Sequence, residues 1–198
     1  MKDIQSKFLF VTITRNTLAN IDEFINSWHK GYNYSNMEFY TDIISKEQID
    51  PSELQRLFKW KNGMPLSSKK TDSFETKILN KIDTINDLKK QWDEQVFKDK
   101  FDGISTVWQI FLLHIIRPDY YPIFDKHVYR ACKYIKEQIP DAKLPLYDRT
   151  KLDIYWKEYL PFYLECKEQM DDRFTSKNLD DALWTFGKFL SEYPKLVL

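Results

Sequence analysis

The residues from Ile104 to Ile116 constrain the fold most, because they are apolar on nearly every side of the helix that they would form. A helix without a polar face has to lie in the interior, with other elements packed around it. Pro118 and Pro122 follow this segment and force the chain to turn. The sequence therefore predicts a central helix that the rest of the chain surrounds.

The surrounding segments also have the pattern of helices, since apolar residues recur at spacings of three and four. Asn20, Asp50 before Pro51, and Asp125 are residue types that cap helix starts. The expected helices cover residues 20–31, 51–62, 71–81, 84–99, 104–116, 125–139, 150–170 with a kink or break at Pro161, and a last helix from Asn178 with Asp181 at its third position. We therefore expect an all-α fold of about eight helices.

Residues 7–14 are β-branched and aromatic, and are expected to form at most one short N-terminal strand or an extended arm. Hydrophobic residues make up 42% of the 198 residues and charged residues 30%, which is enough apolar surface for an ordered core. Neither a repeat nor a linker divides the chain, so residues 1–198 are expected to form a single domain.

Charge and cysteine content exclude several classes of protein. Lys plus Arg equals Asp plus Glu at 30 each, so no overall field attracts nucleic acid or a membrane, and such binding would need a local patch. Cys132 and Cys166 lack the spacing of a disulfide framework, a zinc site or a cysteine-held metal cluster. No signal sequence or membrane span is apparent, and we expect a cytoplasmic protein without metal or other cofactor.

Two spaced motifs flank the central helix. The first is Phe101-Asp102-Gly103-Ile104-Ser105, and the second, after the proline turn, is D-K-H-V-Y-R from Asp125 to Arg130. Together they resemble the helix-hairpin-helix DNA glycosylases, which have an L-P-G-V-G hairpin, a helix and a V-D-T-H-V-x-R segment with a catalytic aspartate. The resemblance covers about 35 residues.

This resemblance implies two α-helical lobes with DNA and a base pocket between them. Residues 1–45 with 141–198 would form one lobe, and residues 46–140 the other. It also implies DNA repair as the process and double-stranded DNA as the partner. Val107 stands where family members that also cleave the strand carry a lysine nucleophile, so lyase activity is not expected. Ser105 and Asp102 replace the second glycine and the proline of the hairpin, which weakens its expected grip on phosphate.

Asp125 is the catalytic candidate. Hydrolysis of an N-glycosidic bond builds positive charge on the deoxyribose, and a carboxylate held ionised at a helix N-terminus can stabilise that charge and orient the attacking water. The alternative interpretation is that Asp125 is only an N-cap. His127 and Arg130 are expected to shape the start of the helix.

Other candidate residues follow from their position in the sequence. Trp108, Gln109 and His114, on the central helix, are candidates for reading a flipped base, although a structural role is the stronger interpretation for each, with Trp108 in the core and Gln109 and His114 satisfied by neighbours. Candidates for binding phosphate are Gly103 and Ser105 in the hairpin, and the basic residues Arg56, Lys59, Lys61, Lys69 and Lys70. An ordinary solvated helix end would also carry such lysines.

The sequence is compatible with three hypotheses on function, of which the first two are the main ones. The first is a monofunctional DNA N-glycosylase that excises a damaged or modified base. The second is a non-catalytic helical protein that uses the same scaffold to bind nucleic acid, a nucleotide or a protein partner. The third is an unrelated helical domain in which the D-K-H-V-Y-R string is a coincidence.

Overall fold

The computed structural model describes residues 20–32 and 37–193, and this part of the chain is helical with no β-strand. The all-α prediction is confirmed, whereas the strand or arm expected at residues 7–14 lies outside the described residues. The helices are α1 (Ile21–Trp28), α2 (Met37–Ile44), α3 (Pro51–Asn62), α4 (Ser68–Lys77), α5 (Ile82–Lys90), α6 (Glu94–Phe101), α7 (Thr106–Ile116), α8 (Lys126–Glu137), α9 (Asp148–Ile154), α10 (Leu160–Glu168) and α11 (Ser176–Glu192). Short 3-10 turns occur at His29–Gly31 and Leu79–Lys81.

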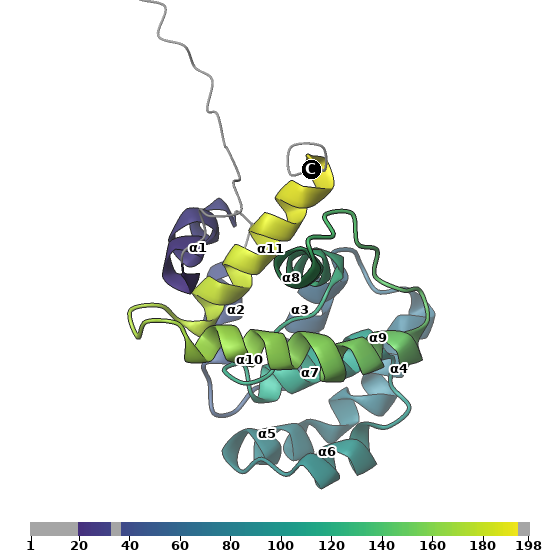
Figure 1. Ribbon diagram of the computed structural model, residues 1–198. Helices are drawn as coiled ribbons and strands as arrows, with labels where there is room; N and C mark the ends of the chain where they lie inside the picture. Colours follow the sequence, from purple (N-terminus) through teal and green to yellow (C-terminus); the bar gives the residue numbers. More distant parts are fainter. Residues whose placement is uncertain (1–19, 33–36, 194–198) are drawn as a thin grey trace, which may run out of the picture.

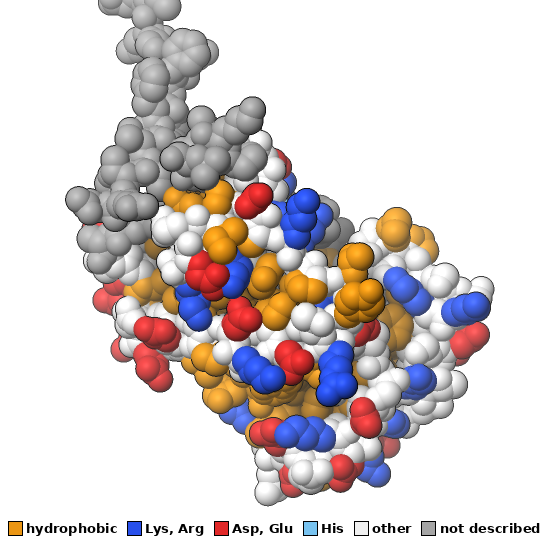
Figure 2. All heavy atoms as spheres, turned by 45° about the vertical axis from the view of Figure 1, so that its right-hand side comes forward, with side chains coloured by type: hydrophobic (Ala, Val, Ile, Leu, Met, Phe, Trp, Pro, Cys, Tyr) orange, Lys and Arg blue, Asp and Glu red, His pale blue; other side chains and the backbone are white. Residues whose placement is uncertain are grey.

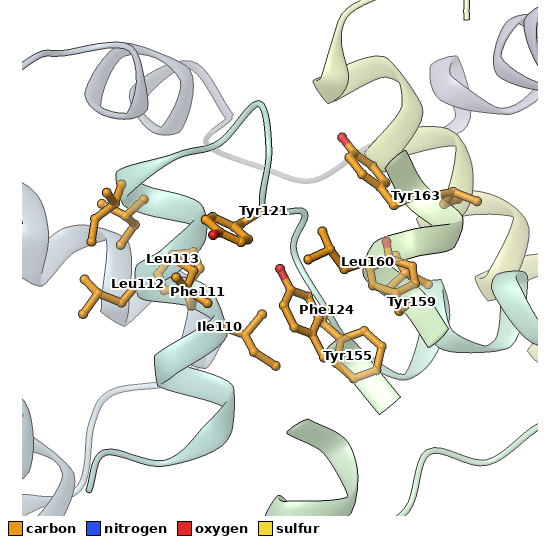
Figure 3. Packing of buried hydrophobic residues seen from close by; sticks show 14 of the residues in the cluster. Ile110, Phe111, Leu112, Leu113, Tyr121, Phe124, Tyr155, Tyr159, Leu160 and Tyr163 are labelled. Carbon is orange, nitrogen blue, oxygen red and sulfur yellow. The ribbon is translucent and has the colours of Figure 1, made fainter. Parts of the chain in front are cut away.

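The helix α7 is the centre of the molecule, as its apolar sequence predicts. Nine of its eleven residues are buried. Figure 3 shows Ile110 and Phe111 of α7 facing the aromatic residues of the segment 155–163, with Phe124 from the loop before α8 between the two layers. Phe124 contacts the ring of Tyr159 at a centroid distance of 5.0 Å. The loop that precedes Asp125 is thus anchored in the core on both sides.

A lysine joins the ends of two helices to α5. The ammonium of Lys89 donates hydrogen bonds to the carbonyl oxygens of Ile115 in α7, at 2.9 Å, and Ile44 in α2, at 3.1 Å. Carbonyl groups in the last turn of a helix lack partners within the helix, so a cation there satisfies them. Burial lowers the pKa of Lys89 to about 8.

The single helix expected over residues 84–99 is wrong, because two helices occupy this region. The helix α5 ends at Lys90, and Asp93 then caps α6 by accepting a hydrogen bond from the Val96 backbone N–H at 2.9 Å. In a continuous helix the Val96 N–H would donate to a backbone carbonyl group. The Asp93 side chain accepts this hydrogen bond instead, which favours a new helix start at this position. Trp92 lies in the break and packs on Tyr121.

The segment from α9 to α10 runs on as one rod rather than breaking at Pro161. A π-helical turn, Tyr155–Tyr159, joins the two α-helices, and Pro161 lies in the first turn of α10. In a π-helical turn the hydrogen bonds reach back five residues instead of four. The carbonyl group that would clash with the proline ring in a regular α-helix is therefore displaced. Figure 1 shows α10 and α9 crossing the middle of the molecule in line.

The last helix begins earlier than expected. Thr175 and Asn178 form a reciprocal capping box, so α11 starts at Ser176 and not at Asn178. In Figure 1, α11 lies with α1 and α8 in the upper part of the molecule, whereas α5 and α6 lie at its lower end. The packing of α8 along α11 joins segments that the expected lobe boundary at residue 140 would separate, and that division stays a prediction.

Candidate functional site

A cavity of about 470 Å³ opens beside the start of α8. It is lined by Tyr32, Trp60, Lys61, Thr106, Val107, Ile110, Ile123, Phe124, Asp125, Lys126, His127, Leu144, Lys151 and Trp184. Its volume lies within the range of about 300 to 1,000 Å³ that is typical of small-molecule sites. Aromatic and aliphatic walls with a few charged groups are the usual composition of such a site.

The Asp125 carboxylate lies at the wall of this cavity, and three N–H groups fix its orientation. Its Oδ1 accepts hydrogen bonds from the backbone N–H groups of His127, at 2.7 Å, and Val128, at 3.2 Å. Its Oδ2 accepts a hydrogen bond from the indole Nε1 of Trp184 at 3.1 Å. Asp125 is therefore the N-cap that its sequence position predicts, and it is also half-buried in a cavity wall.

Close packing of α11 on α8 brings Trp184 to Asp125. Asp180, Trp184 and Gly187 follow one another at spacings of four and three, so they share one face of α11. A Cβ atom at Gly187 would lie 1.9 Å from the backbone oxygen of His127, closer than atoms can approach. Only glycine therefore allows this approach, which places the indole within hydrogen-bonding distance of the carboxylate.

Lys61 enters the cavity from the last turn of α3. Its ammonium lies 5.7 Å from the centre of the Phe111 ring, and no other described residue forms a hydrogen bond or ion pair with it. Burial lowers the pKa of Lys61, while the nearby charges of Asp125 and Asp180 act in the opposite direction. A half-buried ammonium without a bonded anion is suited to binding an anionic group of a ligand.

Two further lysines line the cavity. Lys126 is exposed at the start of α8, and Lys151 on α9 forms an ion pair with Asp148 at 3.2 Å. Elsewhere on the surface, Figure 2 shows basic and acidic side chains intermixed on one face of the molecule, without a large area of one sign. The cavity thus combines three lysines and one carboxylate in a chain whose formal net charge is zero.

Aromatic rings form much of the remaining wall. Trp184 meets Tyr32 edge to face at a centroid distance of 4.9 Å and lies 5.1 Å from the His127 ring. Burial lowers the pKa of His127, and its Nδ1 has no hydrogen-bond partner among the described residues. Such walls can bind the flat faces of a heteroaromatic ring.

The three base-reading candidates lie away from the cavity lining. Trp108 is buried against Phe58, at a centroid distance of 5.4 Å. His114 is buried between Tyr40, whose hydroxyl contacts its Nε2, and the carbonyl oxygen of Tyr121, 2.7 Å from its Nδ1. Burial lowers the pKa of His114 to about 3, so its ring is neutral. Gln109 lines a separate surface hollow with Lys98, Asp99 and Asp102.

The residues of the expected hairpin lie in the turn between α6 and α7. Gly103 has a left-handed φ of 82°, and its carbonyl oxygen accepts a hydrogen bond from Lys77 at 2.9 Å. Ser105 is the N-cap residue of α7 and makes no capping bond with its side chain. Both residues are exposed, while Val107, two residues after Ser105, is 40% exposed and lines the cavity.

The five basic phosphate-binding candidates separate in the structure, and only Lys61 lines the cavity. The guanidinium of Arg56 lies over the Phe39 ring at 4.1 Å. Lys70 donates a hydrogen bond to Asn62 at 2.7 Å, and Lys59 and Lys69 are exposed. These roles stay predictions, with Lys61 in the most favourable position.

Sequence reasoning missed Trp184, Tyr32 and Lys151, because nothing in the linear pattern relates them to Asp125. It also missed Asp180, for which a signal exists. Asp180 lies next to Leu179 and three residues before Leu183, both on the apolar stripe of α11. An acid at this position faces the interior.

Both cysteines are free thiols, and burial raises the pKa of each to about 12. Across residues 20–32 and 37–193, no group of three or more His, Cys, Asp or Glu side chains is arranged to bind a metal ion. Within the same ranges, every helix is too short or too polar to cross a bilayer.

Comparison with known protein families, curated protein sequences and solved structures found no match to this chain.

Proposed function

We propose that this chain is a monofunctional DNA N-glycosylase, or a relative of one, with Asp125 as the essential carboxylate. The observation that carries the proposal is the position of Asp125, whose carboxylate is fixed by three N–H donors at the wall of a cavity of nucleoside size. The D-K-H-V-Y-R segment, which resembles the catalytic segment of helix-hairpin-helix DNA glycosylases, supports the same role.

The proposed reaction breaks the bond between C1′ of a deoxyribose and a base nitrogen. The bonding electron pair leaves with the base, which takes up a proton, and the oxygen of a water molecule bonds to C1′. The Asp125 carboxylate stabilises the positive charge that develops on the sugar and accepts a proton from the water. Each carboxylate oxygen has more than one acceptor site, so the observed hydrogen bonds leave capacity for the water.

The other cavity residues support binding of a flipped nucleotide. Trp60, Trp184 and Tyr32 offer aromatic faces or edges to a base, and Lys61 and Lys126 offer charge to the flanking phosphates. Strand cleavage is not part of the proposal, because Val107 occupies the position of the family's lysine nucleophile. The expected product is an intact strand with an abasic site.

The test uses duplexes that contain uracil, an oxidised purine or an alkylated base. We expect alkali-labile abasic sites from at least one duplex, and a loss of at least a hundredfold in rate for Asp125→Asn. The matched control is Asp93→Asn, since Asp93 caps α6 outside the cavity and asparagine caps a helix equally well. Absence of product from every duplex would exclude the proposal, as would equal rates for Asp125→Asn and the parent.

A second candidate function is binding without catalysis. Val107 and the equal numbers of basic and acidic residues favour it. This alternative expects DNA binding that weakens steeply with salt and is unaffected by Asp125→Asn. Base release by the parent protein would exclude it.

A further inference from the structure

A smaller inner cavity of about 30 Å³ adjoins the main cavity. The two cavities share the lining residues Tyr32, Trp60, Ile123 and Trp184. The inner cavity is completed by Tyr40, Val128, Lys177, Asp180 and Asp181. It has room for about one water molecule, or for one small substituent of a ring that occupies the main cavity.

Asp180 is the unusual group of this inner cavity. It is only 9% exposed, yet its Oδ1 has no hydrogen-bond partner among the described residues. The backbone N–H of Ile123 acts on the same carboxyl group and lowers its pKa, and Oδ1 is the carboxyl oxygen without a partner. A buried polar atom without a partner costs roughly 1 to 3 kcal/mol, so its presence indicates either a bound water or a ligand site.

Charged and titratable groups around Asp180 shift its pKa in both directions. Burial raises its pKa to about 8, Asp181 acts in the same direction, and Lys177 and Lys61 act against it. Lys177 is itself ion-paired with Asp181. The other titratable groups whose charges couple to Asp180 are the phenols of Tyr40, Tyr155, Tyr159 and Tyr163. At neutral pH the carboxyl is therefore mostly protonated, and its open oxygen is an O–H donor.

Asp181, the acceptor in the lining of the inner cavity, is occupied by its ion pair with Lys177, and the other two charged or titratable groups are donors. A protonated Asp180 presents an O–H, and the ammonium of Lys177 presents N–H groups. His114 Nδ1 contacts a carbonyl oxygen, so this nitrogen carries the ring proton and Nε2 is an acceptor. The Tyr40 hydroxyl donates to that Nε2 and is therefore not available to a ligand in the inner cavity. A donor-rich pocket binds an oxygen acceptor and disfavours an amino group, whose own N–H groups would lack partners.

We propose that the inner cavity is a specificity subsite, in which Asp180 and Lys177 bind the exocyclic oxo group of a heteroaromatic base held in the main cavity. The proposal rests on the proposed function in taking a nucleobase as the occupant. Such a subsite would bind uracil more tightly than cytosine, and hypoxanthine more tightly than adenine, because the first base of each pair has an oxo group where the second has an amino group. Trp60 and Trp184 line both cavities, so a ring that packs against them lies next to the inner cavity.

Binding of free bases tests the subsite without requiring hydrolysis. The quenching of tryptophan fluorescence by uracil, cytosine, hypoxanthine and adenine is measured at pH values from 6 to 9.5. We expect each oxo base to bind at least tenfold more tightly than its amino counterpart at pH 6.5, and this preference to decrease as the pH passes about 8. Equal affinities, or no binding of any base, would overturn the proposal.

Two variants of Asp180 and one control sharpen the test. Asp180→Asn keeps a donor in the same place, so it should retain the oxo preference and lose its pH dependence. Asp180→Leu should lose the preference, and Asp172→Asn, at an exposed position, should behave as the parent does. Unchanged behaviour of both Asp180 variants contradicts the inference. If the protein prefers oxo bases but releases no base from DNA, the subsite proposal is supported and the proposed hydrolysis is excluded. If it releases a base but shows no oxo preference, the proposed hydrolysis is supported and the subsite proposal is excluded.

Discussion

Asp180 and His114 are both buried and titratable, yet the fold satisfies the hydrogen-bonding groups of only one of them. Both ring nitrogens of His114 have partners, and its burial is part of the packing between α7 and α2. Asp180 has a carboxyl oxygen without a partner and a raised pKa, and it lines the small cavity that adjoins the large one. Perturbed groups of this second kind are enriched at functional sites, where stability is lost for the sake of binding or catalysis.

Asp180→Asn should stabilise the protein increasingly as pH rises from 4 to 8. The folded-state pKa of Asp180, about 8, lies above the value of 3.8 for the free side chain, so its contribution is fully present below pH 3.8 and is lost as the pH rises through 8. The loss is about 1.4 kcal/mol per pH unit within this window. Urea unfolding of both proteins at pH 4, 6 and 8 measures it, and a pH-independent difference would contradict the assignment.

Trp184→Phe should lower the rate of base release while preserving the fold. Phenylalanine retains an aromatic ring beside Tyr32 but cannot donate to Asp125 Oδ2. A hydrogen bond to a charged group contributes about 1.5 to 3 kcal/mol, which corresponds to a loss of roughly ten- to a hundredfold in rate. Single-turnover kinetics on the best duplex provides the measurement. A change confined to substrate affinity would assign Trp184 to the cavity wall alone.

At the level of helices, caps were predictable where the sequence combines a capping residue with an apolar stripe. Asp50 with Pro51 and Asp125 fulfil this condition, and both cap the expected helices. Asp93 carries the same signal, but the apolar spacing across Trp92 suggested one continuous helix. The π-helical turn before Pro161 was not predictable, because it depends on how the aromatic residues of that rod pack in the core.

Gly187→Ala should separate α8 from α11. The new methyl group would lie 1.9 Å from the His127 backbone oxygen, which belongs to a rigid helix start and cannot rotate away. We expect a loss of about 3 kcal/mol or more in the free energy of unfolding, together with loss of the indole contact to Asp125. Thermal unfolding and tryptophan fluorescence report the two effects.

Gly31→Ala is the matched control for this variant. Its methyl group would meet the Cγ2 atom of Thr185 at 2.7 Å, and Thr185 can change its rotamer. The expected loss is correspondingly smaller, about 1 kcal/mol or less. Equal destabilisation by the two variants would contradict the idea that backbone contact at Gly187 sets the distance between these helices.

For the whole molecule, the all-α class and the central α7 followed from composition and periodicity, whereas the site did not. Asp125 was predicted from its motif, but the cavity around it is built from α3, α7, α8, α9 and α11. Local sequence patterns carry no information on which distant segments meet. The three base-reading candidates on α7 were selected by proximity along the chain. Trp108 and His114 are buried in the core around α7, and Gln109 lines a separate surface hollow.

The salt dependence of DNA binding tests how the whole site engages its partner. The double variant Lys126→Met with Lys151→Met should reduce the slope of log affinity against log salt by about one for each lysine that contacts a phosphate. The control double variant, Lys98→Met with Lys157→Met, removes two exposed lysines that form ion pairs elsewhere, and its slope should stay that of the parent. Identical slopes in all three proteins would place DNA elsewhere or exclude its binding.

The position of α11 in the chain order has a consequence for biosynthesis. Asp180, Asp181 and Trp184 complete the two cavities, yet they are translated after every other residue that lines them. A ribosome-bound nascent chain can fold its earlier helices first, since folding proceeds from the N-terminus during synthesis. The growing polypeptide therefore cannot capture a ligand between these walls until the last helix has emerged from the exit tunnel.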